Sequence, residues 1–324
     1  MVGHLKRAVK GFVPPVVWSA ARWCKLAVAP PPPLPYRVLG TLAEVDAELE
    51  RAIAALSESH EASYAVVDAF GLAYPNDLPT DPESAEYRAR QMEFYRHVSG
   101  RAGYAADECE QIVLPEDRVD RPFPYYTGST AVIGNQLIAM GHVIRALALP
   151  PGARVLEFGP GFGRLTLEMG RSGFRVTAVE INPLYVELIR RDAAREHLPV
   201  EVVRGGMLDF RPTARFDRVV FFESFHHCHD PAAMVARLDE LVAPGGTVLF
   251  AGEPIDDHFP IPWGLRRDGR SLWAIRRFGW WELGFRTDYF LDLLSRHGWA
   301  VQVPPPADSP WQRVFVARRK GAGG

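Results

Sequence analysis

The sequence is poor in cysteine and has no long uninterrupted hydrophobic run. Its three cysteines, Cys24, Cys109 and Cys228, are an odd number and lie far apart in the chain. They form neither a disulfide framework nor a cysteine-based zinc pattern, so a reducing, cytoplasmic environment is expected. No apolar stretch approaches the roughly 20 residues that a membrane-spanning helix needs. Charges and prolines interrupt any apolar core of a signal peptide, so none is expected either.

An excess of charge of one sign is also absent. The 37 Lys and Arg residues nearly balance the 39 Asp and Glu residues, and the formal net charge is −2. This balance argues against a general nucleic-acid-binding protein. Hydrophobic residues, in contrast, make up 47% of the 324 residues. The chain is therefore long and apolar enough for one α/β domain with about a hundred residues of additions.

The first 40 residues are the exception to this balance. Up to Ala43 there are six basic residues and no acidic one. The prolines at 30–33 and Pro35 predict a stiff, extended connector, so we treat residues 1–40 as a basic N-terminal arm. Two interpretations stay open: the arm packs on the protein's own body, which the pattern favours, or residues 1–37 contact an anionic membrane at its inner face.

Residues 41–120 are expected to form a helical cap or lid. Thr41 and Glu44 have the spacing of a helix-capping box, and a stripe of apolar residues follows at helical spacing. Asp81-Pro82-Glu83 predicts a second helix start, with the helix running to about Gly100.

The most informative stretch covers residues 155–163, where a short apolar run ends in a carboxylate and turns on three glycines. The glycines, Gly159, Gly161 and Gly163, are spaced by two. A glycine-rich turn between a strand and a helix lets the backbone approach a ligand that a Cβ would exclude. The spacing is G-x-G-x-G rather than the G-x-G-x-x-G of dinucleotide folds, which favours S-adenosylmethionine over NAD.

Further short apolar runs follow at 174–180, 200–203, 216–222 and 247–251, separated by helical or loop segments. Strands that alternate with helices predict a doubly wound, mainly parallel α/β sheet. Ligands of such sheets bind at the carboxyl ends of the strands.

This order of motifs resembles the class I S-adenosylmethionine-dependent methyltransferases over about residues 125–255. The resemblance is carried by the glycine turn, Glu180, the strand at 216–222 with its trailing His227, and Pro244-Gly245-Gly246. It implies a Rossmann-like, seven-stranded methyltransferase domain over residues 121–318, with the helical cap before it and an insertion after the fifth strand. It also implies S-adenosyl-L-methionine as cofactor.

The resemblance further implies a cofactor site at the ends of neighbouring strands. Its members are Tyr126, Thr127, Glu157, Gly159, Pro160, Gly161, Phe162, Gly163, Glu180, Ile181, Met207, Leu208 and Glu223. Glu180 would hold the ribose, Met207 and Leu208 would flank the adenine, and Tyr126 or Thr127 would bond the methionine carboxylate. The alternative for these last two is packing under the lid.

The chain departs from the family at the adenine contact. Many members carry an acid directly after the glycine of the third loop, but here that position is Gly206 and the acid, Asp209, comes later. Asp209 or a backbone group is expected to take over the contact.

Three residues are candidates for the base that deprotonates an acceptor: His226, His227 and Glu253. A neutral imidazole suits proton transfer near neutral pH, and Glu253 follows a strand whose carboxyl end should reach the site. Because the histidines are adjacent, one is expected to face the substrate and the other to cap or pack. The run lacks the i, i+4 spacing of a paired metal helix, so no metal site is predicted.

The insertion at 253–285 is rich in tryptophan and arginine, and four of the eight tryptophans lie between 263 and 281. Such residues can bind a sugar, a phosphate or a carboxylate, or form a hydrophobic lid or a dimer contact. The segment is similar to methyltransferases of glycosylation pathways. We therefore expect O-methylation of a sugar- or glycan-linked acceptor, with a natural product, a lipid head group or a cofactor-binding scaffold without turnover as alternatives.

Overall fold

The computed structural model describes residues 35–74, 77–110, 119–305 and 312–321. From Tyr36 onward they belong to one compact unit. The basic arm lies almost wholly outside the described residues, so its contact with a membrane stays a prediction. Among the described residues, no helix is both long and apolar enough to cross a membrane.

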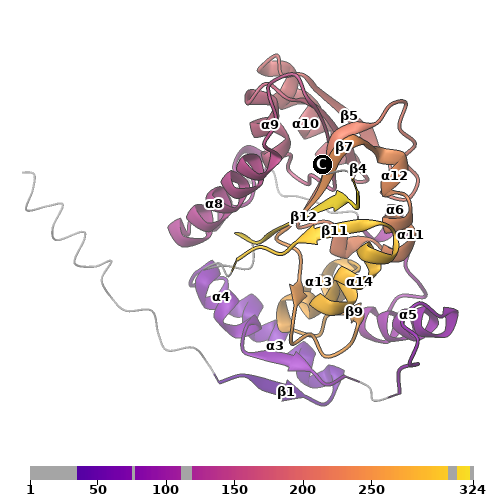
Figure 1. Ribbon diagram of the computed structural model, residues 1–324. Coiled ribbons are helices and arrows are strands. Elements are labelled where there is room, and N and C mark those ends of the chain that lie inside the picture. The colour runs from indigo at the N-terminus through magenta and orange to yellow at the C-terminus, as the bar shows by residue number, and fades with distance from the viewer. Residues whose placement is uncertain (1–34, 75–76, 111–118, 306–311, 322–324) are drawn as a thin grey trace, which may run out of the picture. The chain divides into compact units, whose positions relative to one another are not determined.

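The centre of this unit is a seven-stranded sheet (Figure 1). Its strand order is β11-β12-β7-β6-β3-β4-β5, and β12 alone runs antiparallel to its neighbours. The strands are β3 (Arg154–Phe158), β4 (Arg175–Glu180), β5 (Val200–Arg204), β6 (Phe216–Phe222), β7 (Val242–Ala251), β11 (Trp299–Gln302) and β12 (Val314–Arg319). The predicted doubly wound, mainly parallel sheet is confirmed.

Two apolar clusters cover opposite faces of the sheet, because successive residues of a strand point to opposite sides. On one face, Val155 packs with residues of α8 (Thr130–Leu147) and α9 (Arg164–Arg171). On the other, Phe158 packs with residues of α11 (Pro231–Ala236), α12 (Leu238–Leu241) and α14 (Thr287–Arg296). Helix α10 (Pro183–Arg195) lies beside α9 and completes the layer next to β4 and β5.

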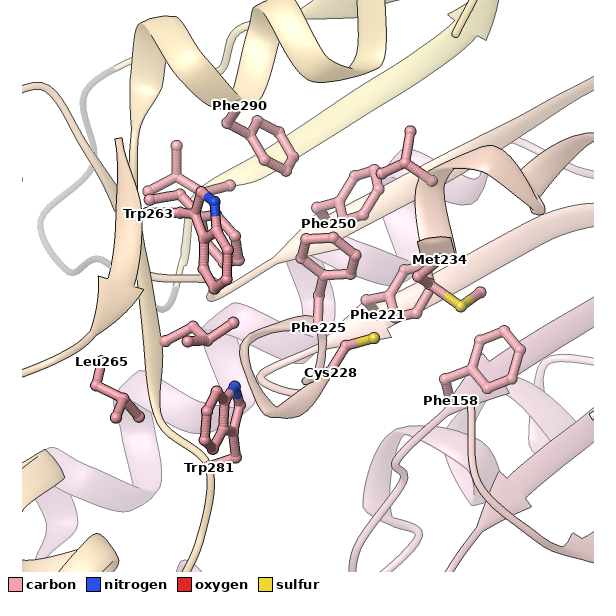
Figure 2. Packing of buried hydrophobic residues seen from close by; sticks show 14 of the residues in the cluster. Phe158, Phe221, Phe225, Cys228, Met234, Phe250, Trp263, Leu265, Trp281 and Phe290 are labelled. Carbon is pink, nitrogen blue, oxygen red and sulfur yellow. The ribbon is translucent and has the colours of Figure 1, made fainter. Parts of the chain in front are cut away.

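A row of phenylalanines fixes the strand ends that lead to the site (Figure 2). The rings of Phe158, Phe221 and Phe250 stack with centroids 5.2 Å apart at each step. Phe225 stands edge-on against Phe221 and Phe250, at 5.3 and 5.0 Å. Each fully buried ring contributes about 1.5–3 kcal/mol. The row therefore anchors the turn after β6, which contains Phe225, to the ends of β3, β6 and β7.

The N-terminal part of the unit contains the two expected helices, α3 (Leu42–Ala55) and α5 (Ala85–Ser99), together with two shorter helices and a small parallel sheet that were not predicted. The shorter helices are α4 (His60–Val67) and α6 (Ala106–Cys109), and the sheet pairs β1 (Arg37–Leu39) with β2 (Phe70–Leu72). The predicted capping box is present at Thr41 and Glu44. Helix α5 starts one turn later than predicted because Ser84, not Asp81, caps it.

The insertion folds against these helices. It contains β8 (Ile255–Asp256), β9 (Trp263–Leu265) and β10 (Leu283–Arg286), paired in the order β8-β10-β9, and helix α13 (Gly269–Phe278). Buried side chains of α5 bond its backbone: the Tyr87 hydroxyl donates to the Trp263 carbonyl at 2.6 Å, and Gln91 accepts from the Leu265 N–H at 3.0 Å. Two segments far apart in the sequence thus form one lid-like layer with α13 packed against α5 (Figure 1).

Candidate active site

The glycine turn between β3 and α9 has the conformation that the sequence predicted. All three of its glycines have positive φ, from +52° to +71°. A Cβ at Gly163 would lie 2.4 Å from Ile189 on α10, so this glycine is needed for packing. At Gly161, in contrast, no atom of the described residues lies within 4 Å of that position. The turn therefore packs tightly at Gly163 and is open toward a ligand at Gly161.

Glu180 ends β4 beside this turn. Its carboxylate accepts hydrogen bonds from the N–H groups of Gly161 at 3.0 Å and Asn182 at 2.8 Å. The residue is 5% exposed, and burial raises the pKa of its carboxyl to about 7. Since a carboxylate can accept about four hydrogen bonds, further donors such as a pair of hydroxyls can be accommodated.

Apolar side chains lie close to the turn and to the loop after β5. The Met207 methyl lies 3.4 Å from the Cβ position of Gly159, and Ile181 lies 3.9 Å from that of Gly206. Leu208, next to Met207, is half-buried against the core. Met207 and Leu208, which were expected to flank an adenine, thus lie beside the glycine turn, and Ile181 approaches the same loop at Gly206.

Polar contacts hold the loop that contains Met207 and Leu208. Arg237 donates to the carbonyls of Met207 at 3.2 Å and Leu208 at 2.7 Å. The carboxylate of Asp209 lies 2.9 Å from the Cβ position of Gly206. An acid is therefore present at the loop although it does not directly follow the glycine.

Two of the expected cofactor residues instead support the site from within the protein. Glu157 is 1% exposed and accepts a hydrogen bond from Thr166 on α9, behind the glycine turn. The Thr127 hydroxyl donates to the Pro124 carbonyl at 2.6 Å and accepts from the Ser129 N–H at 3.2 Å. Its single hydrogen is thus already used, which corrects the idea that Thr127 donates to a carboxylate.

The remaining residues of the turn and its approach are placed by ring contacts and one backbone bond. Tyr126, in the short helix η2 (Tyr125–Thr127), packs its ring against His60 at 5.5 Å. Phe162 packs against Tyr185 of α10 at 4.9 Å, and the Pro160 carbonyl closes the turn by accepting from the Gly163 N–H.

Arg164 is a candidate that the sequence reasoning missed. It follows the glycine turn directly, its guanidinium lies 4.1 Å from the centre of the Tyr125 ring, and Nη2 donates to the Tyr125 hydroxyl. Its other terminal nitrogen, Nη1, is buried and has no hydrogen-bond partner among the described residues. A buried donor without a partner is rare and points to a missing acceptor. A basic residue just after the glycines was the available signal.

The turn after β6, η3 (Phe225–His227), is held by Glu253 at the end of β7. The Glu253 carboxylate accepts from the N–H groups of Ser224, Phe225 and His226 at 2.9, 2.9 and 3.1 Å, and it bonds His226 Nδ1 at 2.8 Å. Burial would raise the pKa of Glu253, but His226 and the backbone donors lower it. With its acceptor positions filled, Glu253 positions His226, which corrects its assignment as a candidate base.

The two histidines lie side by side, contrary to the expectation that one would point away. Their ring centroids are 4.3 Å apart because the tight η3 turn swings both rings to the same side. His227 Nδ1 lies 3.0 Å from the Trp281 carbonyl oxygen, so both Nδ1 atoms have acceptors as partners. This geometry assigns the N–H to Nδ1 in each neutral ring and leaves both Nε2 atoms as bases or ligands.

Three further carboxylates lie near the histidines, of which Glu282 is buried and Glu110 and Glu223 are half-buried. Glu223, in a left-handed conformation (φ 52°), accepts from Gln136 at 2.9 Å, and burial raises the pKa of its carboxyl to about 7. Glu110 accepts from the Tyr104 hydroxyl at 2.8 Å, and burial raises its pKa also. Glu282 Oε2 lies 3.7 Å from His226 Nε2. We call His226, His227 and these acids, together with Glu253, the histidine–carboxylate cluster.

Of this cluster, Glu110 and Glu282 were not among the predicted site residues. Glu110 comes from the segment after α6 and Glu282 from the residue before β10, so both lie far from the histidines in the sequence. Only the position of Glu282 directly after Trp280-Trp281 was a signal in the sequence.

Comparison with known proteins identifies the family of this chain. The model of a family described as "Methyltransferase domain" matches residues 136–303, which confirms the resemblance found in the sequence. An S-adenosyl-L-methionine-dependent Diels-Alderase of Talaromyces variabilis is 33% identical over 133 residues, 38% of this chain and 46% of its own length. A ubiquinone biosynthesis O-methyltransferase of Xanthomonas campestris is 32% identical over 116 residues, 35% of this chain and 48% of its own.

The chain thus spans about half the length of these curated relatives. Among solved structures, the 1,6-didemethyltoxoflavin-N1-methyltransferase of Burkholderia thailandensis is similar, with a TM-score of 0.42 and 21% identity. That match covers 63% of this chain and 84% of the other.

Proposed function

Because the chain belongs to the methyltransferase-domain family, we propose that it binds S-adenosyl-L-methionine and transfers the methyl group to an acceptor hydroxyl at the carboxyl edge of the sheet. The observation that carries this proposal is the arrangement at Glu180. A buried carboxylate with spare acceptor positions bonds the N–H of Gly161, a glycine that has open space at its Cβ position, and this arrangement suits a ribose diol.

The other parts of the cofactor also find suitable partners. The side chains of Ile181, Met207 and Leu208 offer apolar surface to a planar adenine. The unpartnered Nη1 of Arg164 suits a carboxylate, since a guanidinium binds carboxylates through paired donors. The cofactor supplies, when bound, a methyl group on a positively charged sulfur.

The chain's own task is to position the acceptor and remove its proton. In the transfer, the acceptor oxygen would form a bond to the methyl carbon while the carbon–sulfur bond breaks. The electron pair of the broken carbon–sulfur bond would stay on sulfur and neutralise its positive charge. The acceptor's proton leaves to the histidine–carboxylate cluster, where the Nε2 atoms of His226 and His227 are the basic positions. Glu253 keeps the His226 ring in the required tautomer and orientation, so it acts as a positioning residue.

For the acceptor we propose a sugar- or glycan-linked hydroxyl. A cavity of about 370 Å³ lies between the insertion and β2, and Glu253 contributes to its wall. Tyrosine and phenylalanine rings, arginines and acids line it: Tyr36, Leu72, Tyr74, Glu253, Pro254, Ile255, Asp256, Phe259, Pro260, Arg266, Arg267, Asp268 and Arg313. Arg267 Nε is buried in this wall without a hydrogen-bond partner among the described residues. Rings and charged forks together suit a hydroxylated, negatively charged group.

The alternative acceptors are a natural product, such as the substrate of a biosynthetic O-methyltransferase, and a lipid head group. A second class of function is cofactor binding without methyl transfer, and the relative named as a Diels-Alderase makes this alternative concrete. Incubation of the enzyme with each acceptor class and mass spectrometry of the products separates these cases.

The cofactor assignment has a separate test. Titration calorimetry should show binding of S-adenosylmethionine or of S-adenosylhomocysteine to the full chain and no comparable binding of NADH. Binding of NADH without binding of S-adenosylmethionine would refute the proposed function.

A further inference from the structure

We propose that His226, His227 and Glu282 bind a divalent transition-metal ion next to the site of methyl transfer. One potential ligand atom from each residue lies within 4.8 Å of the other two. His226 Nε2 and Glu282 Oε2 are 3.7 Å apart, and the side chain of Glu282 is largely buried. The sequence did not predict this site because the third ligand comes from another element.

The hydrogen bonds of the two rings have the pattern found around metal-bound histidines. A metal-ligating imidazole usually donates its other N–H to a carboxylate or a backbone carbonyl, which fixes the tautomer and aims the ligand nitrogen. Here His226 Nδ1 is 2.8 Å from the Glu253 carboxylate, and His227 Nδ1 is 3.0 Å from the Trp281 carbonyl oxygen. Each ring thus has one outer partner on Nδ1, which leaves Nε2 as its available ligand nitrogen.

The charge around the rings also calls for a cation. Glu110, Glu223, Glu253 and Glu282 all interact electrostatically with His227 or with one another. Arg266 interacts electrostatically with Glu282, but it is paired with Asp268 at 2.9 Å. Buried and half-buried carboxylates that have few cations near them among the described residues are costly, and a divalent ion between them would offset that cost.

The ligand types narrow the choice of ion. Two imidazoles and one carboxylate suit Zn²⁺, Fe²⁺ or Mn²⁺ better than Mg²⁺ or Ca²⁺, which prefer oxygen ligands. Metal–ligand distances of about 2.0 Å place bound ligand atoms about 3.3 Å apart. The observed spacing is wider, 3.7 Å between His226 Nε2 and Glu282 Oε2 and up to 4.8 Å within the group, so rotations of the side chains would have to close the site on the ion. Three protein ligands leave at least one position open.

The role of the ion in turnover rests on the proposed function. An acceptor hydroxyl at the open position would ionise more easily, because a bound divalent cation lowers the pKa of an oxygen that contacts it. Its proton would pass to a neighbouring carboxylate of the cluster. The histidines would then hold the ion rather than take the proton directly.

Calorimetric titration of the chelator-treated full chain with Zn²⁺ tests the site. The comparison uses wild type, His226→Ala, Glu282→Gln and, as matched control, His229→Ala, which changes an exposed histidine of the same loop. We expect one Zn²⁺ per chain for wild type and control. The other two variants should bind at least roughly 100-fold more weakly, since even outer partners of a metal site contribute 10–100-fold. Glu282→Gln keeps the shape of the side chain and protects the test from a folding defect in His226→Ala.

S-adenosylhomocysteine binding and methyl transfer, measured on the same samples, separate the two proposals. If wild type binds no Zn²⁺, or if all four proteins bind it equally, the metal site is refuted. Full methyl transfer by the chelated enzyme would leave the proposed function standing and also refute the ion's role. A Zn²⁺ site lost in both variants, in a protein without methyl transfer, would support the metal site while the proposed function failed.

Discussion

Replacement of Glu180 by alanine should weaken cofactor binding without abolishing the fold. Glu180 is buried beside the glycine turn, and the N–H groups of Gly161 and Asn182 already orient its carboxylate. Hydrogen bonds from two ribose hydroxyls to such a charged acceptor contribute about 1–3 kcal/mol. Loss of the carboxylate should therefore raise the dissociation constant of S-adenosylhomocysteine about 5- to 150-fold.

The assay must distinguish a lost ribose contact from a distorted turn, because Glu180→Ala also leaves the two N–H groups without their acceptor. Calorimetry with S-adenosylhomocysteine and with its analogue lacking both ribose hydroxyls gives a double cycle. The analogue should bind wild type as weakly as the normal ligand binds the variant, and the variant should bind both ligands alike. Glu187→Ala, at an exposed position on α10, is the matched control and should change nothing. Equal, additive losses for both changes would show that Glu180 does not contact the ribose.

Three other results are expected. Burial raises the pKa of Glu157 to about 7, so ionisation of this group lowers the stability of the ligand-free protein as pH rises from about 4.5 to 7. In urea unfolding, Glu157→Gln should reduce this fall in the free energy of unfolding and should be up to about 3 kcal/mol more stable than wild type above pH 7. An unchanged pH dependence would contradict the assignment. His226→Ala should lower turnover about 10²–10⁴-fold with cofactor binding intact, while His229→Ala should not. Burial lowers the pKa of His227, but the neighbouring carboxylates raise it by more, so its pKa is raised on balance. The wild-type rate should therefore fall as pH drops below neutrality, and a rate that is flat in this range would argue against a neutral imidazole. Arg164→Met should weaken S-adenosylhomocysteine about 10- to 150-fold and leave 5′-methylthioadenosine, which lacks the carboxylate, unaffected; equal weakening of both would place Arg164 elsewhere.

The sequence was sufficient for features that depend on neighbouring residues. The glycine turn, Glu180 at the end of its strand and the capped helix α3 all follow from local patterns of apolar residues, glycines and caps. Strand alternation then placed the ends of β3, β4 and β6 at one edge of the sheet, because parallel strands joined by crossovers put these ends together.

Features that depend on tertiary packing were missed. Gln91 and Tyr87 bond the insertion only because α5 lies against β9, and no local pattern indicates that contact. The pairing of the histidine rings depends on the η3 turn held by Glu253. The approach of Glu282 to this turn depends on how the insertion folds back, so the composition of the cluster was out of reach.

The central claim is that this chain transfers a methyl group from S-adenosylmethionine to a hydroxylated acceptor. The most direct measurement is incubation of the full chain with S-adenosylmethionine carrying a deuterated methyl group and with sugar-linked, phenolic and lipid-head-group acceptors, followed by mass spectrometry. We expect S-adenosylhomocysteine and one acceptor class heavier by a single labelled methyl group on oxygen, with the sugar-linked class as that acceptor. Tight cofactor binding with no labelled product in any class would refute methyl transfer by this chain.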